Sequence, residues 1–320
     1  MQEADSEDPR RGTGHRHELH ERTVEEIHEF IRKESPSTNI RTVRRGELTD
    51  EHVHGTDLVV SIGGDGTALQ TSHAVGGDVP LLGICSDPTP AQERKRANHA
   101  EQDVRRSTGA LCAVTRENYQ EYLAGVLTGK LRPSERTRIM VTVKPAGAAI
   151  SEMQRLPWAL NDILVAHPSP AAVSRYRMGI WEGREHIRDH GEAAASQERL
   201  VRENVRSSGL RVCTATGSTA AMRSAGGLPM PFDTPETPGC NRILQYMVRE
   251  PIDVQHGVLM RGILDPDRSL RLRWNSLDGA IFVDGSNITY RIRMGDRIWI
   301  SAAAPSLWLY PREPWYLSGH

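Results

Sequence analysis

The chain has 320 residues, enough for two domains of ordinary size, and its 40 basic and 41 acidic side chains give a formal net charge of −1. This balance excludes a generally basic surface of the kind that binds nucleic acid or anionic membranes. No apolar run approaches the roughly 20 residues of a membrane-spanning helix, and the charged N-terminus lacks the apolar core of a secretory signal.

The first part of the chain alternates between helical and strand patterns. Residues 1–20 are expected to form a disordered leader. Val24, Ile27 and Ile31 share one helical face, which predicts a helix over 21–34 that ends before Ser35-Pro36. Strands are predicted at 40–43, 57–62 and 80–84, and a further helix at 119–127. The alternation predicts a doubly wound α/β domain over 21–135, although an opening strand before residue 21 is not obvious.

The pattern changes near residue 135. Short strand-like segments, separated by Gly, Asp and Pro, follow one another with little helical periodicity. They predict a mainly β domain over 136–310, with 311–320 as a C-terminal tail. Residues 183–204 are charged and Ala-rich, which predicts a surface excursion, and Asp284-Gly285 predicts a hairpin turn. The predicted strands are 138–143, 158–166, 174–180, 209–214, 257–264, 269–274, 280–283, 288–292 and 297–302.

The four cysteines are widely spaced and form no C-x-x-C pair. This spacing predicts reduced thiols in a cytosolic-type compartment rather than disulfides or a zinc site. The thirteen histidines show no metal-ligand spacing, so no protein metal site is predicted. The cysteines are Cys85, Cys112, Cys213 and Cys240.

A glycine-rich turn ends the apolar strand at 57–62. Three glycines surround Asp65, and Thr67 is expected to open a helix with a hydroxyl cap. Glycine lets the backbone approach a phosphate closely, and N–H groups at a helix start attract anions. A carboxylate at this place does not neutralise the charge of phosphates. This favours a role for Asp65 as a catalytic base over a purely binding role for the loop. The alternative is a tight turn in which Asp65 caps the helix.

Two later segments also carry polar groups suited to a nucleotide. Asn161 and Asp162, at a predicted strand start, offer an amide and a carboxylate to a ribose or a base edge; the alternative is an Asx turn, which is common. The second segment runs from a strand into Thr216-Gly-Ser-Thr219 and a small-residue helix ending at a double glycine. Hydroxyls and free N–H groups there would form an anion and sugar cradle, and a plain capped helix is the alternative.

Together the three motifs resemble the NAD kinase family in their order and spacing. They are Gly-Gly-Asp-Gly-Thr at 63–67, Asn-Asp at 161–162 and Thr-Gly-Ser-Thr-Ala at 216–220. The first motif also occurs in diacylglycerol and sphingosine kinases, whereas the third is much more specific. Five further segments are similar to the plant NADH kinase branch: 82–89, 106–112, 170–175, 206–211 and 247–252. The likeness covers roughly residues 40–305.

The resemblance implies transfer of the ATP γ-phosphate to the 2′-hydroxyl of the adenosine ribose of NAD(H), with Mg²⁺ bound through the ATP phosphates. It implies that Asp65 is the base and that Asn161 and Asp162 hold the ribose and adenine side. It also implies a homodimer whose second domain completes the site. The phosphate loop would be Gly63, Gly64, Gly66 and Thr67; the dinucleotide site would include Thr216, Gly217, Ser218, Thr219, Ala220 and Ser224, with Arg206 and Ser208 flanking the nicotinamide half.

The chain departs from the family pattern at three places. Asp162 stands where most members have Glu, Ser208 where they have Asp, and Ala221 where they have Tyr. A carboxylate at 208 would favour the cationic nicotinamide ring of NAD⁺. Its loss supports the hypothesis of a preference for neutral NADH.

Other functions compete with this interpretation. A lipid kinase shares the Asp65 loop but does not explain the 216–220 motif. A catalytically weak dinucleotide-binding module is compatible with the missing opening strand. Neither nucleic acid nor a membrane is expected as a partner. We expect a cytosolic location; the plant branch includes peroxisomal members, but the ending at 317–320 matches the peroxisomal Ser-Lys-Leu signal poorly.

Overall fold

The computed structural model describes residues 9–87, 110–182, 199–231, 242–252 and 260–312. The chain divides into two compact units. Unit 1 consists of Met1–Ser134 and Trp308–His320, and unit 2 consists of Glu135–Leu307. Each unit has a hydrophobic core of its own.

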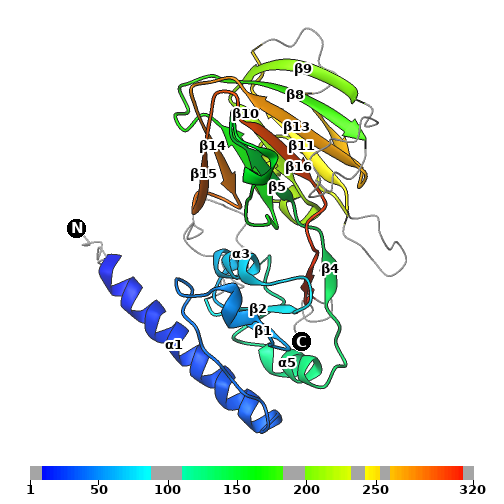
Figure 1. The fold of residues 1–320 in the computed structure, drawn as a ribbon. Helices are drawn as coiled ribbons and strands as arrows, with labels where there is room; N and C mark the ends of the chain where they lie inside the picture. The colour runs from blue at the N-terminus through cyan, green and yellow to red at the C-terminus, as the bar shows by residue number, and fades with distance from the viewer. Residues whose placement is uncertain (1–8, 88–109, 183–198, 232–241, 253–259, 313–320) are drawn as a thin grey trace, which may run out of the picture. The chain divides into compact units, whose positions relative to one another are not determined.

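Unit 1 is an α/β domain built on a small sheet (Figure 1). The strand order is β1-β2-β17-β4, and β3 pairs with the C-terminal end of β2. Strand β2 runs parallel to β1, β3 and β17. The helices are α1 (Pro9–Glu34), α2 (Asp50–Val53), α3 (Asp65–Ala74) and α5 (Tyr119–Leu127); the strands are β1 (Val59–Ile62), β2 (Leu81–Cys85), β3 (Val114–Thr115), β4 (Ser134–Arg136) and β17 (Leu307–Leu309).

Helix α1 begins well before the predicted start. Residues 9–20 were expected to belong to a disordered leader, but they are helical; residues 1–8 lie outside the described part. Low apolar content suggested disorder, yet Arg, Glu and His are all compatible with a solvated helix. A contact between His20 Nδ1 and Ser86 Oγ, 3.1 Å long, also ties this part of the helix to the end of β2. The predicted end before Ser35-Pro36 is confirmed.

The other predictions for unit 1 had mixed outcomes. The strands at 57–62 and 80–84 and the helix at 119–127 are confirmed, whereas residues 40–43 form no strand. The predicted extent of the β domain, 136–310, was also wrong at its end. Strand β17 returns to unit 1 and pairs with β2 through Leu309 and Leu81. Pro311 of the predicted tail also contacts unit 1, since the Tyr122 hydroxyl donates to Pro311 O at 2.5 Å. Residues 313–320 lie outside the described part.

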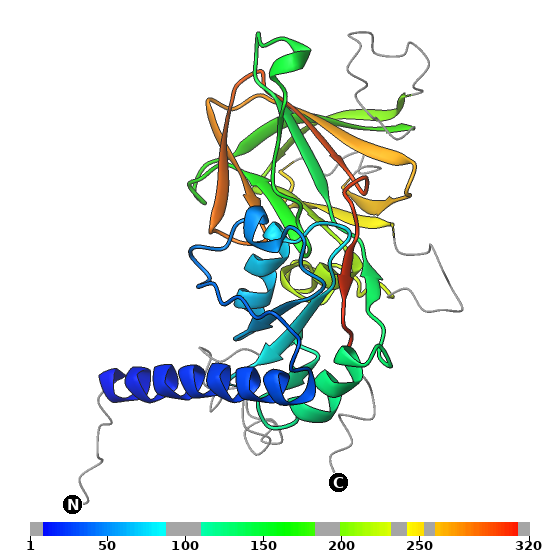
Figure 2. The ribbon, with the colours of Figure 1, turned by 60° about the horizontal axis from the view of Figure 1, so that its bottom comes forward.

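Unit 2 consists of two six-stranded sheets that share one core (Figures 1 and 2). The β7 sheet has the order β12-β11-β10-β7-β14-β15, and the β13 sheet has the order β6-β5-β16-β13-β8-β9. The β7 sheet contains β7 (Asp162–Ala166), β10 (Gly209–Cys213), β11 (Leu244–Arg249), β12 (Arg261–Leu264), β14 (Asp278–Val283) and β15 (Ile288–Arg293). The β13 sheet contains β5 (Met140–Lys144), β6 (Gln154–Arg155), β8 (Ser174–Glu182), β9 (Arg199–Ser207), β13 (Arg268–Trp274) and β16 (Arg297–Ser301).

Each predicted strand of this domain corresponds to a strand of the structure, although β7 begins only at Asp162 and residues 257–259 lie outside the described part. Three strands were missed: β6, β9 and β11. Strand β9 (Arg199–Ser207) begins within the predicted excursion at 183–204 and extends beyond it; residues 183–198 lie outside the described part. It is an edge strand, and such a strand needs few apolar residues because it has one neighbour and one solvated face.

Candidate active site

In unit 1, the glycine turn joins β1 to α3. Gly63 has φ of +153°, and a Cβ there would lie 2.6 Å from Thr67 Oγ1, so only glycine fits. The turn is pinned to β2 because the Gly63 N–H donates to Ile84 O at 2.9 Å. The helix was expected to open at Thr67 but begins at Asp65, with Gly64 as its N-cap residue. Asp65 therefore lies in the first helical turn.

The Asp65 carboxylate is half-buried and oriented by the backbone. Its Oδ1 accepts the N–H of Leu111 at 2.7 Å. Gly66, the next residue, is exposed, and a Cβ on it would meet no atom within 4 Å. Among the described residues, space is therefore open beside the Gly66 backbone. An anionic group with several oxygens could approach the backbone there.

Two thiols lie close behind this turn. Cys85 and Cys112 are both buried and free, and their thiols hydrogen-bond to each other. The Cys112 thiol also donates to Gly63 O at 3.8 Å. The hydrogen bond with the Cys85 thiol, followed by burial, raises the pKa of Cys112. Cys213 is free too, whereas Cys240 lies outside the described residues.

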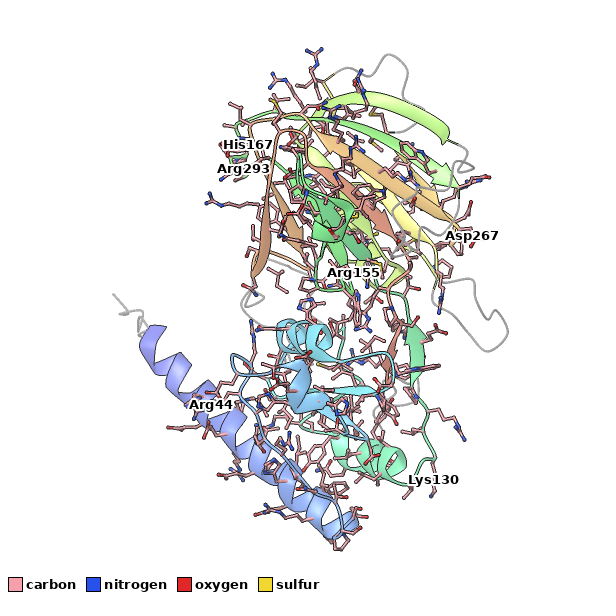
Figure 3. All side chains as sticks on the ribbon, viewed as in Figure 1. Arg44, Lys130, Arg155, His167, Asp267 and Arg293 are labelled. Atoms are coloured by element: carbon pink, nitrogen blue, oxygen red, sulfur yellow. The ribbon has the colours of Figure 1, made fainter. Side chains whose placement is uncertain are left out.

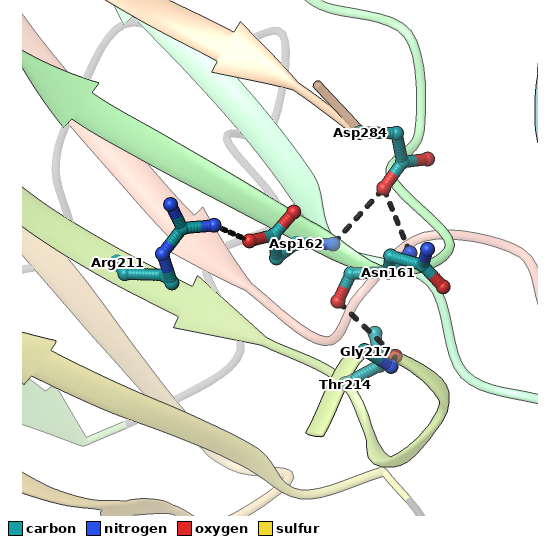
Figure 4. A network of polar contacts seen from close by, with 6 residues as sticks. All are labelled: Asn161, Asp162, Arg211, Thr214, Gly217 and Asp284. Carbon is teal, nitrogen blue, oxygen red and sulfur yellow. Dashed lines mark hydrogen bonds and ion pairs between the residues drawn. The ribbon is translucent and has the colours of Figure 1, made fainter. Parts of the chain in front are cut away.

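In unit 2, one carboxylate organises the Asn161-Asp162 segment (Figure 4). Asp284 Oδ1 accepts the N–H groups of Asn161 at 2.7 Å and Asp162 at 2.9 Å, and its Oδ2 accepts the N–H of Leu160 at 2.8 Å. Asp284 adopts φ of +52° at the start of the predicted hairpin turn between β14 and β15. Three charge-assisted hydrogen bonds thus fix the backbone where β7 begins.

The side chains of Asn161 and Asp162 have different surroundings. Asn161 Oδ1 is buried and accepts no hydrogen bond from any described residue. Asp162 is buried and forms an ion pair with Arg211 of the adjacent strand β10. Burial raises the pKa of the Asp162 carboxyl, and the Arg211 guanidinium offsets part of that effect. Asn161 therefore has an unused acceptor for a ligand donor, while Asp162 is engaged inside the protein.

The 216–224 segment differs from the single predicted helix. It forms two short helices, α6 (Ala215–Ser218) and α7 (Ala221–Ser224). Thr214 caps α6 by accepting the Gly217 N–H at 3.2 Å, and its own hydroxyl donates to Leu160 O at 2.5 Å. Gly217 lies so close to Asn161 that a Cβ on it would be 2.0 Å from Asn161 O. The second and third motifs are thus in direct contact.

The predicted residues of this segment divide by exposure. Thr219, Ala220 and Ser224 are exposed, and Thr216 is half-buried. Ser218 is fully buried, and its hydroxyl donates to Ala215 O at 2.7 Å while accepting the Met230 N–H at 2.9 Å. Ser218 therefore holds the loop together and presents no group to a ligand.

Arg206 and Ser208 lie at the other end of strand β10 from Thr214. Arg206 is exposed on β9, in register with Arg175 of β8. The Ser208 hydroxyl donates to Glu250 Oε2 at 2.5 Å, and Glu250 Oε1 lies 3.9 Å from an Arg249 nitrogen. The fold thus brings residues 161–162 into contact with residues 214–217. Residues 206–208 lie away from both, because the extended strand β10 puts roughly 20 Å between residues 208 and 214.

Four residues that act on the site were not found from the sequence: Leu111, Arg211, Glu250 and Asp284. Leu111 acts through its backbone, so its side chain gives no signal. Arg211 and Asp284 reach their partners across neighbouring strands, which requires the strand order. For Asp284 a signal was present, since an Asp-Gly pair marks a turn with positive φ, but its carboxylate was not given a role.

Among the described residues, no group of three or more His, Cys, Asp or Glu side chains is placed to hold a metal ion. Among the same residues, no helix is both long and apolar enough to cross a membrane.

Comparisons with known proteins converge on one family. Residues 10–86 match the model of the ATP-NAD kinase N-terminal domain. A probable NADH kinase of Oryza sativa subsp. japonica is 40% identical over 268 residues, which is 83% of this chain and 74% of that one. An NADH kinase of Arabidopsis thaliana is 38% identical over 290 residues, or 90% of this chain and 82% of that one.

Solved structures share the fold. The crystal structure of an NAD kinase from Archaeoglobus fulgidus in complex with ATP matches with a TM-score of 0.63 at 17% identity, covering 92% of this chain and 91% of that one. The crystal structure of yeast NADH kinase complexed with NADH matches with a TM-score of 0.58 at 20% identity, covering 81% of this chain and 62% of that one. With two plant relatives near 40% identity over most of its length, the chain belongs to the NAD kinase family.

Proposed function

We propose that this NAD(H) kinase transfers the γ-phosphate of ATP to the 2′-hydroxyl of the adenosine ribose of NADH, with Asp65 as the base. The observation that carries the proposal is the oriented Asp65 carboxylate in the first turn of α3, next to open space at Gly66. Phosphoryl transfer depends on positioning and charge neutralisation more than on covalent help from the protein. A turn that admits phosphates beside a fixed carboxylate meets the need for positioning.

The loop from Gly63 to Thr67 would bind the ATP phosphates, and Asp65 would orient the acceptor hydroxyl and take its proton. The hydrogen bond from Leu111 keeps the carboxylate in one orientation, so less reorganisation is needed during transfer. Asp65 adds negative charge beside phosphates. We propose that Mg²⁺, bound through those phosphates, supplies the compensating charge.

The dinucleotide is assigned to the segments around Asn161 and Gly217. The unused Asn161 Oδ1 suits a ribose hydroxyl, because a hydroxyl can donate the hydrogen bond that this buried acceptor lacks. Thr219, Ala220 and Ser224 are exposed and can contact the adenosine half. Asp162, paired with Arg211, would act as a positioning residue that fixes the strand on which Asn161 lies.

The test is product analysis after incubation with ATP, Mg²⁺ and either NADH or NAD⁺. Asp65→Asn keeps an oxygen for the Leu111 N–H, so the fold should be retained while the rate falls by roughly 10²–10⁴. Asp57→Asn, an exposed site in the same unit, is the matched control. If Asp65→Asn keeps half or more of the wild-type rate, the role of Asp65 as base is wrong.

A catalytically weak binding module is separated by a second measurement. Isothermal titration with ATP and with NADH reports binding independently of turnover. An idle module would bind both ligands and form no NADPH, and its Asp65→Asn variant would behave as the wild type does. The proposed enzyme binds both and forms product.

Charge at Ser208 bears on the choice between NADH and NAD⁺. A carboxylate is present after all, because Glu250 accepts the Ser208 hydroxyl, but Arg249 lies 3.9 Å from the same carboxylate and offsets it. The position is therefore near neutral, which supports a preference for NADH. Ser208→Asp should raise kcat/KM for NAD⁺ relative to NADH severalfold. Equal efficiency on both forms in the wild type, with no gain in Ser208→Asp, contradicts this.

A homodimer would explain why the predicted dinucleotide residues fall into two sets. Asn161 and Gly217 lie near one end of β10, and Arg206 and Ser208 near the other. We propose that Arg206 and Ser208 of a second copy complete each site. Mixing inactive Asp65→Asn with inactive Arg206→Ala should then restore part of the activity. Two variants that stay inactive in a proven mixed dimer would rule this out.

The cytosol is the proposed compartment. Free buried thiols at Cys85, Cys112 and Cys213 fit a reducing environment. Relatives from Xenopus tropicalis, Rattus norvegicus and Homo sapiens, 26–27% identical, are named NAD kinase 2, mitochondrial. A peroxisomal location is the alternative from the plant branch. Imaging of a fluorescent fusion of the full chain distinguishes the three.

A further inference from the structure

The β13 sheet carries a row of positive charges on the face turned away from the core. Along β5, β16, β13 and β8 every second residue packs into the core, so the residues between them lie on the opposite face. In register across these strands, Lys144 is paired with Arg297, Arg297 with Arg273, and Arg273 with Arg177. Like charges placed directly opposite destabilise a sheet. The stability of the sheet therefore does not explain why four positively charged residues lie in one row.

Most of this charge is not neutralised by any residue that the structure describes. The side chains of Lys144, Arg273 and Arg297 form no ion pair or hydrogen bond with any residue that the structure describes. Arg177 donates from Nε to Asn204 Oδ1 at 3.0 Å. The sequence neighbour Asp296 does not compensate either, because it is buried and its two oxygens accept the N–H groups of Ala146 and Arg293, each at 2.8 Å.

A cavity of about 220 Å³ opens at one end of the row. Lys144, Arg273 and Arg297 line it together with two turns, represented by Gly147 and Gly295. Asp296 ties these turns to each other through its two hydrogen bonds. Three cations that have no partner among the described residues, set around this backbone concavity, suit a phosphate group, to which Arg can bind in bidentate fashion.

An aromatic cavity of about 280 Å³ adjoins the first one and shares Arg273 and Arg297 with it. Trp181 and Trp299 line its walls, with Met178 and Leu272. Trp299 lies in the next row, which runs from Arg155 (labelled in Figure 3) through Thr142 and Trp299 to Arg271. Trp299 Nε1 is buried and donates to no described residue. This indole N–H would be satisfied by an acceptor on a ligand.

We propose that the two adjoining cavities form a second nucleotide site, lying wholly within unit 2. The phosphates of a nucleoside di- or triphosphate bind Lys144, Arg273 and Arg297, and its base lies against Trp299. Base stacking on an aromatic ring combined with cationic contacts to phosphate is a general way to bind nucleotides. A second copy is a poorer occupant, because a two-fold contact through this face would bring the cationic rows together.

The experiment uses the full chain and ADP as the probe. Calorimetry measures affinity and stoichiometry, and hydrogen–deuterium exchange locates the binding. ADP should protect amides at 144–147 and 294–299, separately from any protection at 63–67. Arg273→Gln/Arg297→Gln should weaken this site by more than about tenfold, as expected for loss of charged hydrogen bonds, and leave kcat and KM unchanged. Both arginines are exposed, so the variant should fold.

Three comparisons make the test decisive. Arg291→Gln/Arg293→Gln removes the same charge from β15, where Arg293 is labelled in Figure 3, and should bind as the wild type does. A comparable loss in this control overturns the proposal. Trp299→Phe should weaken ADP binding severalfold and pyrophosphate binding hardly at all. Equal binding of ADP and pyrophosphate, unaffected by Trp299→Phe, overturns the nucleotide assignment. Sedimentation showing a wild-type dimer that Arg273→Gln/Arg297→Gln dissociates would assign the face to a second copy instead.

Discussion

Two glycines of the site have different surroundings. At Gly217 the fold excludes any side chain, since a Cβ would lie 2.0 Å from Asn161 O, whereas a Cβ on Gly66 would meet no described atom within 4 Å. Gly217→Ala should therefore destabilise unit 2 by roughly 1–3 kcal/mol or more through overpacking. Urea unfolding of the variant measures this change. An unchanged unfolding midpoint would mean that α6 can move away from β7 at little cost.

Gly66→Ala should show the opposite behaviour. Gly66 lies within helix α3, where alanine is favoured over glycine, so stability should rise by roughly 0.5–1 kcal/mol. The added methyl group would occupy the space assigned to the ATP phosphates. Catalytic efficiency should fall on the order of 10²-fold, because small displacements of reacting groups are costly. A stable variant with full activity would show that ATP does not approach the backbone there.

Asp284 is the residue on which the dinucleotide segment depends most. Asp284→Ala would leave the N–H groups of Leu160, Asn161 and Asp162 without their acceptor, at about 1–3 kcal/mol for each one that stays dry. Asp284→Asn keeps one acceptor oxygen and tolerates φ of +52°, so its loss should be smaller. Thermal unfolding and the KM for NADH should follow this order. Asn287→Ala, exposed in the same hairpin, should change neither quantity.

At the scale of elements, β4 is joined to the segment before β17 by the Glu135 carboxylate. Glu135 Oε1 accepts from Ser306 Oγ at 2.6 Å and from Arg242 Nη2 at 3.1 Å. The hydrogen bond from Ser306, followed by the Arg242 contact, holds the pKa of Glu135 below its ordinary value. A lowered folded-state pKa gives stability that is present above the unfolded pKa, about 4.3, and is lost as the pH falls through the folded-state pKa.

The wild type should therefore be more stable than Glu135→Gln at pH 7, and the difference should shrink as the pH is lowered below about 4.3. Thermal melts of both proteins between pH 3 and pH 7 measure this. Exposure and screening limit the effect, because the side chain is 36% exposed. A difference between the two melting temperatures that stays constant across this range would show that the contact does not depend on the charge of Glu135.

At the scale of the whole molecule, unit 1 depends on the C-terminal strand β17, with which the chain returns to it. Strand β17 lies between β2 and β4, and beyond it Tyr310 packs edge-on against Tyr122 at 6.4 Å between ring centroids. A chain ending at Ser306 would lose an interior strand and expose the backbone groups of β2. It should show no cooperative unfolding of unit 1. A chain ending at Arg312 keeps these contacts and should melt as the full chain does.

Much of the fold follows from local pattern. Apolar runs bounded by glycine predict β1 and β2, helical spacing predicts α5, and alternation predicts most strands of unit 2. The errors have a common cause. Residues 40–43 have a strand-like composition but pair with no strand of the described residues, whereas β9 and β17 become strands because they pair with β8 and β2. Pairing is a property of the tertiary structure, so no window of the sequence contains it.

The sequence by itself determined the three motifs, their order and the family to which they point, because glycine, carboxylate and hydroxyl residues at these spacings are local chemistry. The tertiary structure alone decided how their atoms are used. It paired Asp162 with Arg211, placed Glu250 against Ser208 and bonded Asp284 to the backbone where β7 begins, while the Asn161 oxygen has no partner among the described residues. Each of these contacts joins residues far apart in the chain, and only strand order and register bring such residues within hydrogen-bonding distance.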